Sequence, residues 1–548
     1  MDVFTGKGVS GGIAFGTAVV LQGEDASVDE SRAENPEKEW DSFLAAKKSA
    51  DEELSQLFEK TRREIGEKEA MIIDVQRMML DDGDFNDAVS DSIHKDRCRA
   101  AAAAARAGKQ FSEFFAGLDD PYMQARSADV ADVAKRLVRI LTGRRARNRR
   151  PQELYVLLAE DLSPSETLQL DKKILQAIVT KGGAANSHTA ILARALNIPC
   201  VVKADLAELA PYDGLSAAVD GGEGKLYLEP DSGTLSRLRA AQEEYQASRQ
   251  RLETLRGLPS VTKDGRKIRL FVNIAGPDDL GKVLENDAEG IGLFRSEFLY
   301  LGRDSYPGEE EQFEAYRKVA QGMQGRTVVI RTADIGADKT APYLQLPHEE
   351  NPALGLRGVR LCFARPEIFK IQLRAIYRAA AFGSVAVMFP MIISHWELRR
   401  CRQMAEEARA GLEREGKTIG PLRFGAMIET PAAALTAAEL AREVDFFSVG
   451  TNDLTQYTLA VDRQSSADLS RYWEPHHPAL LRLLQMVAEE AHAAGIWAGI
   501  CGELAADPNL TKTFLQMGYD ELSVAPGYLL GLRQSIRNMD LSKESAME

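Results

Sequence analysis

Cysteine is scarce in this chain, which contains five cysteines among 548 residues. They are scattered through the sequence, and no two of them form a C-x-x-C pair. An odd, unpatterned set argues against a disulfide framework and favours reduced thiols in a reducing compartment. The cysteines are Cys98, Cys200, Cys362, Cys401 and Cys501.

Long apolar runs and an excess of basic residues are also missing. No segment approaches the roughly 20 apolar residues that a membrane helix needs, and the opening MDVFTGKGVSGG lacks a signal region that is first basic and then apolar. The 68 basic and 82 acidic residues give a net charge of −14, and the basic run GRRARNRR is short. We therefore expect a soluble cytoplasmic protein without membrane insertion or general nucleic-acid binding.

The length of 548 residues predicts two to four domains. Residues 1–22 contain a strand-like piece, and residues 152–230 alternate strand and helix patterns around the run DKKILQAIVT. Between them the pattern becomes helical, with one apolar face predicted from Trp40, Phe43, Leu44, Leu54, Leu57 and Phe58. A helical pattern from residue 234 to a stop at Gly257 and Pro259 predicts a connecting helix.

Strands and helices then alternate to the end of the chain, which predicts a (β/α)₈ barrel. The charged residues at the carboxyl ends of the predicted strands favour an active site there, because barrel enzymes build their sites at that face. The eight strand candidates are KIRLFVNI, GIGLFRSEF, TVVIRTADIG, SVAVMFPMI, RFGAMIET, VDFFSVGTND, WAGICGEL and ELSV.

One histidine stands where a loop enters a predicted helix, in the run GGAANSHTAILARALNIPC. The free N–H groups at a helix start favour an anion such as phosphate, and the imidazole nitrogen of His188 is a nucleophile near neutral pH. A phosphoryl acceptor is therefore chemically reasonable. A surface histidine at a helix start, with its hydrogen bonds made and no role in catalysis, would explain this stretch equally well.

The predicted strand ends carry groups suited to a phosphorylated substrate. Arg295, Arg331 and Arg463 suggest a ligand with several negative groups. Glu429 and Asp453 fit a Mg²⁺ site that keeps positions open for substrate oxygens, although buried carboxylates paired with arginines would look the same. Cys501 ends another strand, where a lone cysteine is usually a small buried apolar residue.

Several runs of this sequence resemble enzyme I of the bacterial sugar phosphotransferase system, the phosphoenolpyruvate-protein phosphotransferases. The resemblance covers essentially the whole chain in order, and GTNDLTQYTLAVDR is its most specific motif. The other runs are SHTAILARALNIPCVV, GLFRSEFLY, VVIRTADIGADK, ENPALGLRGVR, MFPMI, IETPAAA and CGELA.

The resemblance implies a multidomain α/β fold with four parts. A swivelling phosphohistidine α/β domain would comprise residues 1–22 and 144–230, and an all-α insert at 23–143 would dock HPr, a small phosphocarrier protein. Residues 231–258 would form the connecting helix. Residues 259–548 would form a TIM barrel that binds phosphoenolpyruvate and makes a homodimer.

The resemblance also implies a reaction, the first step of sugar uptake. His188 would take the phosphoryl group of phosphoenolpyruvate and pass it to HPr, releasing pyruvate, with Thr167 hydrogen-bonded to the histidine. Cys501 would protonate the enolate carbon, and Glu429 and Asp453 would hold Mg²⁺. The expected substrate-binding residues are Arg295, Arg331, Arg357, Asn452 and Arg463.

The sequence departs from the family pattern at a few positions. Ala184, Ala185 and Asn186 precede Ser187 in the histidine loop, Lys203 stands at a family glycine, and Gln76 stands at a family histidine. These departures bear on the carrier partner and the transfer rate, so a paralogue that serves a different HPr-like carrier stays open.

Two further readings also stay open on the sequence. A pyruvate phosphate dikinase or phosphoenolpyruvate synthase would need a nucleotide-binding domain, for which no P-loop or comparable region fits before residue 150. A regulatory phosphoprotein without catalysis would have no need for the charged groups at the strand ends.

Overall fold

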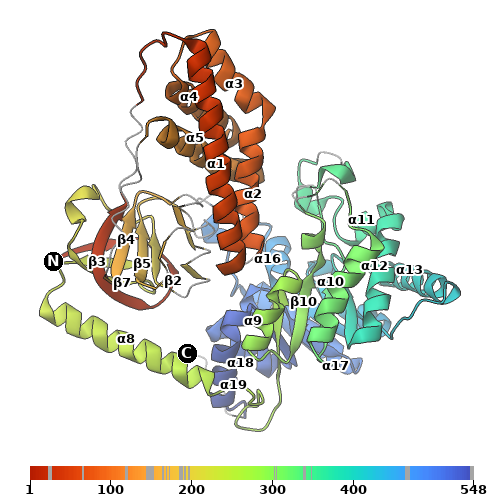
Figure 1. Cartoon of the computed structure of the whole chain (residues 1–548). Coiled ribbons are helices and arrows are strands. Elements are labelled where there is room, and N and C mark those ends of the chain that lie inside the picture. Colours follow the sequence, from red (N-terminus) through yellow and green to blue (C-terminus); the bar gives the residue numbers. More distant parts are fainter. Residues whose placement is uncertain are drawn as a thin grey trace. The chain divides into compact units, whose positions relative to one another are not determined.

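The structure is a computed structural model of the chain, which divides into two compact units, Met1–Arg249 and Gln250–Glu548 (Figure 1). Among the described residues, no helix has the length and apolar character to cross a membrane. The structure describes residues 1–21, 28–64, 67–117, 121–143, 153–162, 166–167, 170–171, 173–183, 189–190, 193–194, 198–301, 303, 305–336, 341–346, 349–462 and 469–542.

The first unit contains an eight-stranded mixed sheet. Strands β3 to β6 run parallel to one another, and the remaining strands pair antiparallel at the two sides. The strands are β1 (Asp2–Thr5), β2 (Lys7–Ser10), β3 (Ile13–Leu21), β4 (Tyr155–Ala159), β5 (Leu175–Thr180), β6 (Cys200–Val202), β7 (Ser216–Asp220) and β8 (Lys225–Leu228), in the order β1-β8-β7-β3-β4-β5-β6-β2.

The sheet buries apolar side chains on both faces. Along β4, Val156 and Leu158 belong to one apolar cluster, while Tyr155 and Leu157 belong to another. This explains why the central strands read as continuous apolar runs. The short strands β1, β2 and β8 lack such runs and were missed by the sequence analysis.

Five helices are described between β3 and β4, in residues 28–64, 67–117 and 121–143, and they share an apolar core of their own. Phe43, Leu54 and Leu57 are buried in it, and Trp40 and Phe58 pack against it. The prediction was wrong for Leu44, which is 44% exposed because it follows Phe43 directly and so points about 100° away from it around the helix. The helices are α1 (Pro36–Glu64), α2 (Glu67–Asp81), α3 (Gly83–His94), α4 (Ala100–Ala116) and α5 (Pro121–Leu141).

Helix α8 (Ser232–Glu253) ends four residues before the predicted stop at Gly257. Its first half packs on the sheet, because Leu238 joins a small cluster with Ala218 and Gln242 donates to the Ile13 carbonyl at 2.7 Å. Leu252 in the last turn of the helix and Leu255 just after it pack against the core of the second unit.

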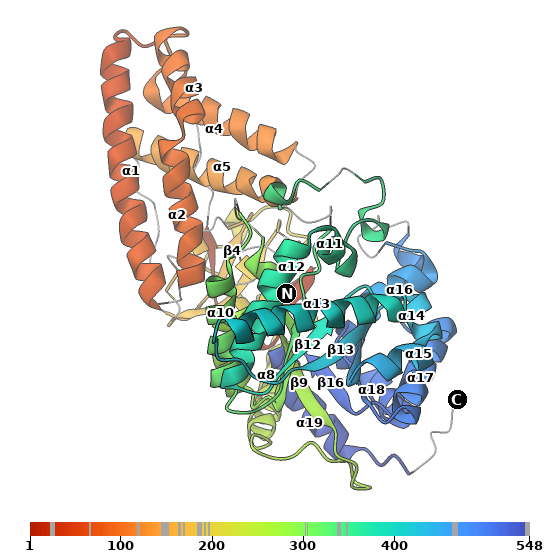
Figure 2. The ribbon, with the colours of Figure 1, turned by 90° about the vertical axis from the view of Figure 1, so that its right-hand side faces the viewer.

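The second unit is a closed barrel of eight parallel strands, which confirms the predicted (β/α)₈ fold (Figures 1 and 2). Each of the eight predicted runs contains one strand. The strands are β9 (Arg269–Ile274), β10 (Gly290–Arg295), β11 (Val328–Arg331), β12 (Val385–Phe389), β13 (Arg423–Ile428), β14 (Phe446–Val449), β15 (Trp497–Ile500) and β16 (Glu521–Val524).

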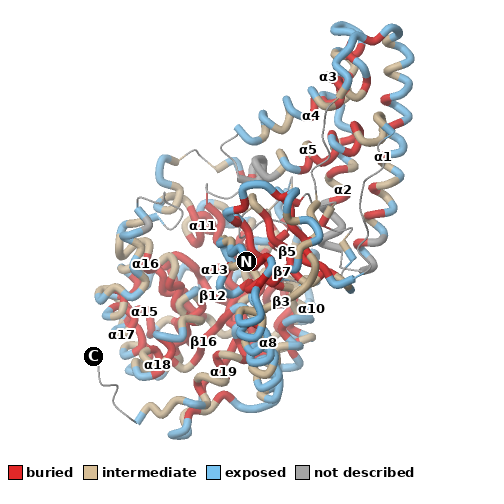
Figure 3. Tube along the Cα trace, turned by 90° about the vertical axis from the view of Figure 1, so that its left-hand side faces the viewer, coloured by how far each residue is buried: buried red, intermediate tan, exposed pale blue. Residues whose placement is uncertain are grey.

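Helices surround the barrel and bury the outer faces of its strands in one large core (Figure 3). The strands are buried along almost their whole length, as a sheet covered on both faces requires. The helices are α9 (Leu280–Glu285), α10 (Glu309–Gly322), α11 (Val359–Ala364), α12 (Pro366–Ala379), α13 (His395–Arg414), α14 (Pro431–Leu435), α15 (Ala437–Leu440), α16 (Thr451–Leu459), α17 (Pro478–Ala493), α18 (Pro508–Met517) and α19 (Leu529–Asn538).

The helices of the first unit also bury a polar cluster. Gln76 is fully buried and donates to the Asp132 carboxylate at 2.9 Å, while Asp129 lies 3.7 Å from the Arg126 guanidinium. Burial raises the pKa of Asp129 to about 6, although Arg126 lowers it. The folded pKa therefore lies above the ordinary value of 3.8, and this carboxyl group destabilises the folded state increasingly as pH rises between about 4 and 6.

We predict that Asp129→Asn stabilises the helical bundle at pH 8 by up to about 3 kcal/mol and leaves it nearly unchanged at pH 4. The asparagine lacks the buried charge that the parent protein acquires above pH 6. Urea titrations at the two pH values, followed by circular dichroism, measure the difference. Asp41→Asn, at an exposed position of α1, is the matched control; an equal gain at both pH values would contradict the prediction.

Candidate active site at the mouth of the barrel

The carboxyl ends of the barrel strands bring together six of the residues that the sequence analysis singled out. Arg295 and Arg331 are the last residues of β10 and β11, Glu429 follows β13, and Cys501 follows β15. Asn452 and Asp453 lie in the first turn of α16, directly after β14. Parallel strands of a closed barrel end on the same face, so residues far apart in sequence meet here.

A seventh predicted residue, Arg357, reaches the same place from the segment before α11. Its guanidinium donates to both carboxylate oxygens of Asp334, at 3.2 and 2.8 Å, and to Oδ1 of Asp453 at 3.2 Å. It also donates to the Tyr457 hydroxyl at 3.1 Å. Asp334 and Asp453 raise the pKa of Arg357 against the opposing effect of burial.

Arg331 shares the carboxylate of Asp334. Its guanidinium lies 3.2 Å from Asp334 and 2.5 Å from Glu297, and all three side chains are at most 8% exposed. Burial lowers the pKa of Arg331, but the negative charges of Glu297 and Asp334 raise it, and the net shift is upward. The guanidinium therefore stays charged.

Arg295 differs from the other two arginines because its guanidinium makes no hydrogen bond or ion pair with any residue in the described part of the chain. Burial and the neighbouring positive charge of Arg331 lower its pKa. A mostly buried guanidinium without a carboxylate partner costs free energy, and an anionic ligand at this position would remove that cost.

Glu429 provides an oxygen that is open to a cation. It is fully buried, and its Oε1 accepts from the Met391 N–H at 2.6 Å, while Oε2 has no hydrogen-bond partner among the described residues. Gly450 keeps this space free, because a Cβ there would lie 2.9 Å from Oε2. Burial, followed by the charges of Asp453 and Asp334, raises the pKa of Glu429 to about 8.

A divalent cation fits this pair of carboxylates. Magnesium commonly binds one or two protein carboxylates and takes its remaining oxygens from water and substrate phosphate. The buried Oε2 of Glu429 beside the negative charge of Asp453 is what such a cation would neutralise. The part of the chain that the structure describes holds no cluster of three or more His, Cys, Asp or Glu side chains suited to a metal ion.

Asn452 is held by a residue that the sequence analysis did not assign. Its side-chain amide donates to Glu503 Oε1 and its carbonyl accepts from the Glu503 N–H, both at 3.0 Å. The two residues follow neighbouring strands, β14 and β15, and each orients the other. Glu503 lies in the quoted run CGELA, so its place after a strand end was the available signal.

Cys501 is buried in the interior of the mouth, where 1% of it is exposed. Its thiol donates to the Val449 carbonyl at 3.6 Å. Burial raises the pKa of the thiol to about 12. The thiol therefore carries its proton at neutral pH, which a general acid requires.

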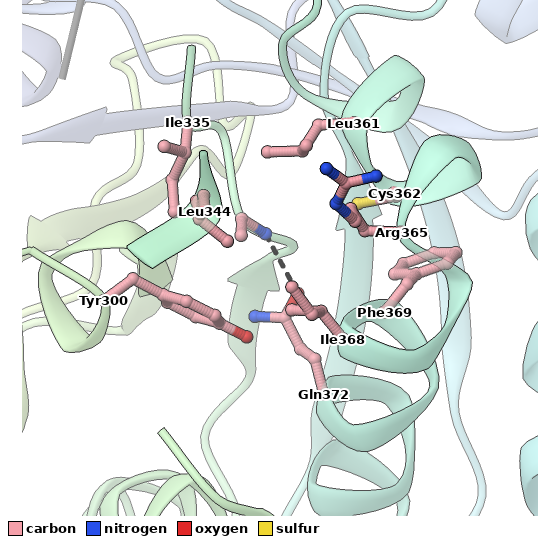
Figure 4. Close-up of a pocket in the computed structure, with 10 residues that line it drawn as sticks. Tyr300, Ile335, Leu344, Leu361, Cys362, Arg365, Ile368, Phe369 and Gln372 are labelled. Atoms are coloured by element: carbon pink, nitrogen blue, oxygen red, sulfur yellow. Dashed lines mark hydrogen bonds between the residues drawn. The ribbon is translucent and has the colours of Figure 1, made fainter. Parts of the chain in front are cut away.

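A network behind the mouth aligns the ends of β10 and β11. The Ser296 hydroxyl donates to the Arg331 carbonyl at 2.6 Å, and Gln372 donates to Ser296 while it accepts from the Ala333 N–H at 2.9 Å. Figure 4 shows Gln372 beside a pocket lined by Tyr300, Ile335, Leu344, Leu361 and Ile368. Sequence reasoning missed Gln372 because no pattern marks a buried helical glutamine as a support for strand ends.

Two predicted site residues, His188 and Arg463, lie outside the described residues, as do Ala184, Ala185 and Asn186. Thr167 is described and is 2% exposed in the first unit. Lys203 has a φ of +53°, a left-handed conformation that favours glycine, which gives a physical reason for a family glycine there.

Three domain families of phosphoenolpyruvate-utilising enzymes match successive parts of the chain. Residues 5–126 match their N-terminal domain, residues 151–224 their mobile domain and residues 249–541 their phosphoenolpyruvate-binding domain. The barrel with its charged mouth is thus the part that matches the phosphoenolpyruvate-binding domain.

Whole-length relatives agree with this assignment. The phosphoenolpyruvate-protein phosphotransferase of Staphylococcus carnosus is 40% identical over 540 residues, which are 98% of this chain and 94% of the relative. That of Listeria innocua is 40% identical over 542 residues, 98% of this chain and 94% of the relative. That of Bacillus subtilis is 39% identical over 548 residues, 100% of this chain and 96% of the relative. The chain therefore belongs to the phosphoenolpyruvate-protein phosphotransferases, the enzyme I family, and catalyses transfer of a phosphoryl group from phosphoenolpyruvate to protein.

Proposed function

We propose that this enzyme takes the phosphoryl group of phosphoenolpyruvate onto His188, passes it to the phosphocarrier HPr or an HPr-like protein, and releases pyruvate in the cytoplasm. The observation that carries the proposal is the buried mouth of the barrel. It combines a lone guanidinium, two paired guanidinium groups and an open carboxylate oxygen.

The arginines would bind the anionic groups of the substrate. Phosphoenolpyruvate carries a phosphate and a carboxylate, so Arg295, with no partner in the described residues, would take one of these groups. Arg331 and Arg357 are fixed by Asp334 and need little reorganisation on binding. Arg463 and Asn452 would complete the binding set. Donors that are already positioned stabilise the developing charge at little cost.

Glu429 and Asp453 would hold Mg²⁺. When bound, the ion would neutralise phosphate oxygens and so make phosphorus accessible to a nitrogen nucleophile. The two carboxyl groups would thereby fix the position of the ion, while the buried walls around Glu429 exclude water. Binding of the ion would favour the ionised form of Glu429, whose pKa is otherwise raised to about 8, so substrate and ion are expected to bind together.

His188 would be the nucleophile and Cys501 the acid. Transfer of the phosphoryl group to His188 breaks the bond between phosphorus and the enol oxygen, and the enolate of pyruvate remains. The Cys501 thiol would donate its proton to the terminal carbon of that enolate. Thr167 would hydrogen-bond His188 and orient its ring.

The helical insert would bind the carrier protein. Within it, Leu44, Met78 and Phe114 are apolar and 44%, 68% and 61% exposed, which supports a protein-binding role. We further propose that the barrel unit forms a homodimer, and analytical ultracentrifugation of the full chain measures this directly.

The experiment that tests the proposal uses ³²P-labelled phosphoenolpyruvate and Mg²⁺. We predict an acid-labile phosphohistidine in the parent protein that disappears in His188→Ala, because no other residue is proposed to accept the group. The exposed His492 in α17 provides a matched control, His492→Ala, which should label normally. Labelling of His188→Ala at the parent level would contradict the assignment.

We predict that Cys501→Ser slows pyruvate formation by about 10²- to 10⁴-fold, the usual contribution of a general acid. A hydroxyl is nearly isosteric with the thiol but is a far weaker acid. Single-turnover formation of pyruvate from phosphoenolpyruvate measures the change. Cys401→Ser, which alters another fully buried thiol on α13, should keep the parent rate; an equal loss in both variants would refute a special role for Cys501.

We predict that Glu429→Gln raises the Mg²⁺ concentration needed for half-maximal pyruvate formation by about 10- to 100-fold, since the neutral amide is a poor magnesium ligand. A titration with Mg²⁺ at fixed phosphoenolpyruvate measures the shift. Glu413→Gln, exposed on α13, serves as the control. An unchanged magnesium requirement in Glu429→Gln would show that this carboxylate does not hold the ion.

A further inference from the structure

Tyr457 is a residue of the barrel mouth to which neither the sequence analysis nor the proposed reaction gives a role. It lies in α16, four residues after Asp453, so the two side chains emerge on the same side of the helix. The side chain is half-buried. Its hydroxyl group contacts two groups of the segment that follows β11, which are the Ala353 carbonyl and the Arg357 guanidinium.

The two contacts use the Tyr457 hydroxyl group in opposite directions. A hydroxyl group has one proton to donate and two lone pairs that accept. The Ala353 carbonyl can only accept, so it receives the hydroxyl proton, and the Arg357 guanidinium can only donate, which it does at 3.1 Å. Burial raises the pKa of Tyr457 to about 12, so the hydroxyl group keeps its proton at neutral pH. One oxygen atom therefore satisfies both groups at once.

The contact with Ala353 anchors the segment that leads to Arg357. Within the ranges that the structure describes, it is the only hydrogen bond that joins residues 349–356 to a residue beyond 349–360. The segment follows β11 and Tyr457 follows β14, and β12 and β13 separate these two strands in the closed barrel. Tyr457 thus joins two parts of the mouth that do not come from neighbouring strands.

The contact with Arg357 completes the hydrogen bonding at one end of its guanidinium group. An arginine side chain has five N–H donors. Nε and Nη2 donate to Asp334 at 3.2 and 2.8 Å. Nη1 donates to Asp453 at 3.2 Å and to Tyr457 at 3.1 Å. The remaining N–H, on Nη2, has no partner in the described part of the chain, so a ligand would meet a guanidinium group in a fixed orientation with one donor available.

Loss of the Tyr457 hydroxyl group would release both of its partners. Nη1 of Arg357 would keep Asp453 as its only acceptor among the described residues, and the Ala353 carbonyl would have none. The guanidinium group and its segment would then have to become ordered when a ligand binds. Ordering a side chain and a loop on binding lowers the affinity for the ligand.

We propose that Tyr457 is a positioning residue for phosphoenolpyruvate. Its hydroxyl group holds Arg357, and the segment that carries this arginine, in the orientation that receives an anionic group of the substrate. This inference rests on the role of Arg357 in substrate binding, which is itself proposed above. It assigns Tyr457 no contact with the substrate.

The test measures single-turnover formation of pyruvate by the full-length enzyme with Mg²⁺ over a range of phosphoenolpyruvate concentrations. The rate constants give a half-saturating concentration and a maximal rate constant. In Tyr457→Phe the half-saturating concentration should rise about tenfold, because the hydroxyl group is hydrogen-bonded to a charged partner. The maximal rate constant should stay within about threefold of the parent value, because Arg357 binds the substrate equally in the ground state and the transition state.

Tyr519→Phe is the matched control. Tyr519 is fully buried, and its hydroxyl group also donates to a backbone carbonyl, that of Leu484, at 2.9 Å. It lies between α18 and β16, at the amino-terminal end of the barrel strands, so this variant should keep the parent half-saturating concentration. An equal rise in both tyrosine variants would reflect a general loss of packing and would overturn the proposal.

A double-mutant cycle with Arg357→Met separates this inference from the substrate role of Arg357. Arg331 lies 3.2 Å from Asp334 and keeps that carboxylate paired in the variant. If Tyr457 acts through Arg357, Tyr457→Phe should raise the half-saturating concentration by less than about threefold once Arg357→Met is present. The same tenfold rise in both backgrounds overturns the proposal.

The single variants distinguish the two ways in which the inference can fail. A parent-like half-saturating concentration in Tyr457→Phe, together with a raised one in Arg357→Met, removes only the positioning role of Tyr457. A parent-like value in Arg357→Met refutes the substrate role of that arginine and overturns this inference with it.

Discussion

The buried carboxylate of Asp334 is the interaction on which the barrel mouth depends, because two buried guanidinium groups share it. Arg331 and Arg357 come from separate segments of the chain, and each lies within 3.2 Å of this one side chain. Removing one partner of a buried ion pair leaves an uncompensated charge and typically costs about 3–5 kcal/mol. The pairs hold the arginines charged and fixed before a substrate arrives.

Charge balance also explains why the mouth is suited to an anion together with a cation. Arg295 has no partner among the described residues, and one oxygen of Glu429 has none either. The site thus lacks an anion beside Arg295 and a cation beside Glu429. A phosphate group accompanied by a divalent ion would satisfy both deficits at once, whereas a neutral ligand would satisfy neither.

The interior of the barrel is not uniformly apolar below the mouth. Ser448 of β14 and Glu521 of β16 are buried in one row with Gly499 of β15, and Cys501, buried as well, directly follows β15. Barrel interiors are usually filled by branched apolar residues.

Sequence patterns alone identified the eight barrel strands and placed Arg295, Arg331, Glu429 and Cys501 at their ends, because buried parallel strands read as apolar runs and polar residues stand out after them. Only the tertiary structure showed which of these groups pair with Asp334 and which have no partner. Pattern analysis could not identify Gln372 or Glu521, because a single polar residue in an apolar run gives no periodic signal. Their significance comes from closure of the barrel, which sets strands far apart in sequence against one another and decides which polar groups are buried together.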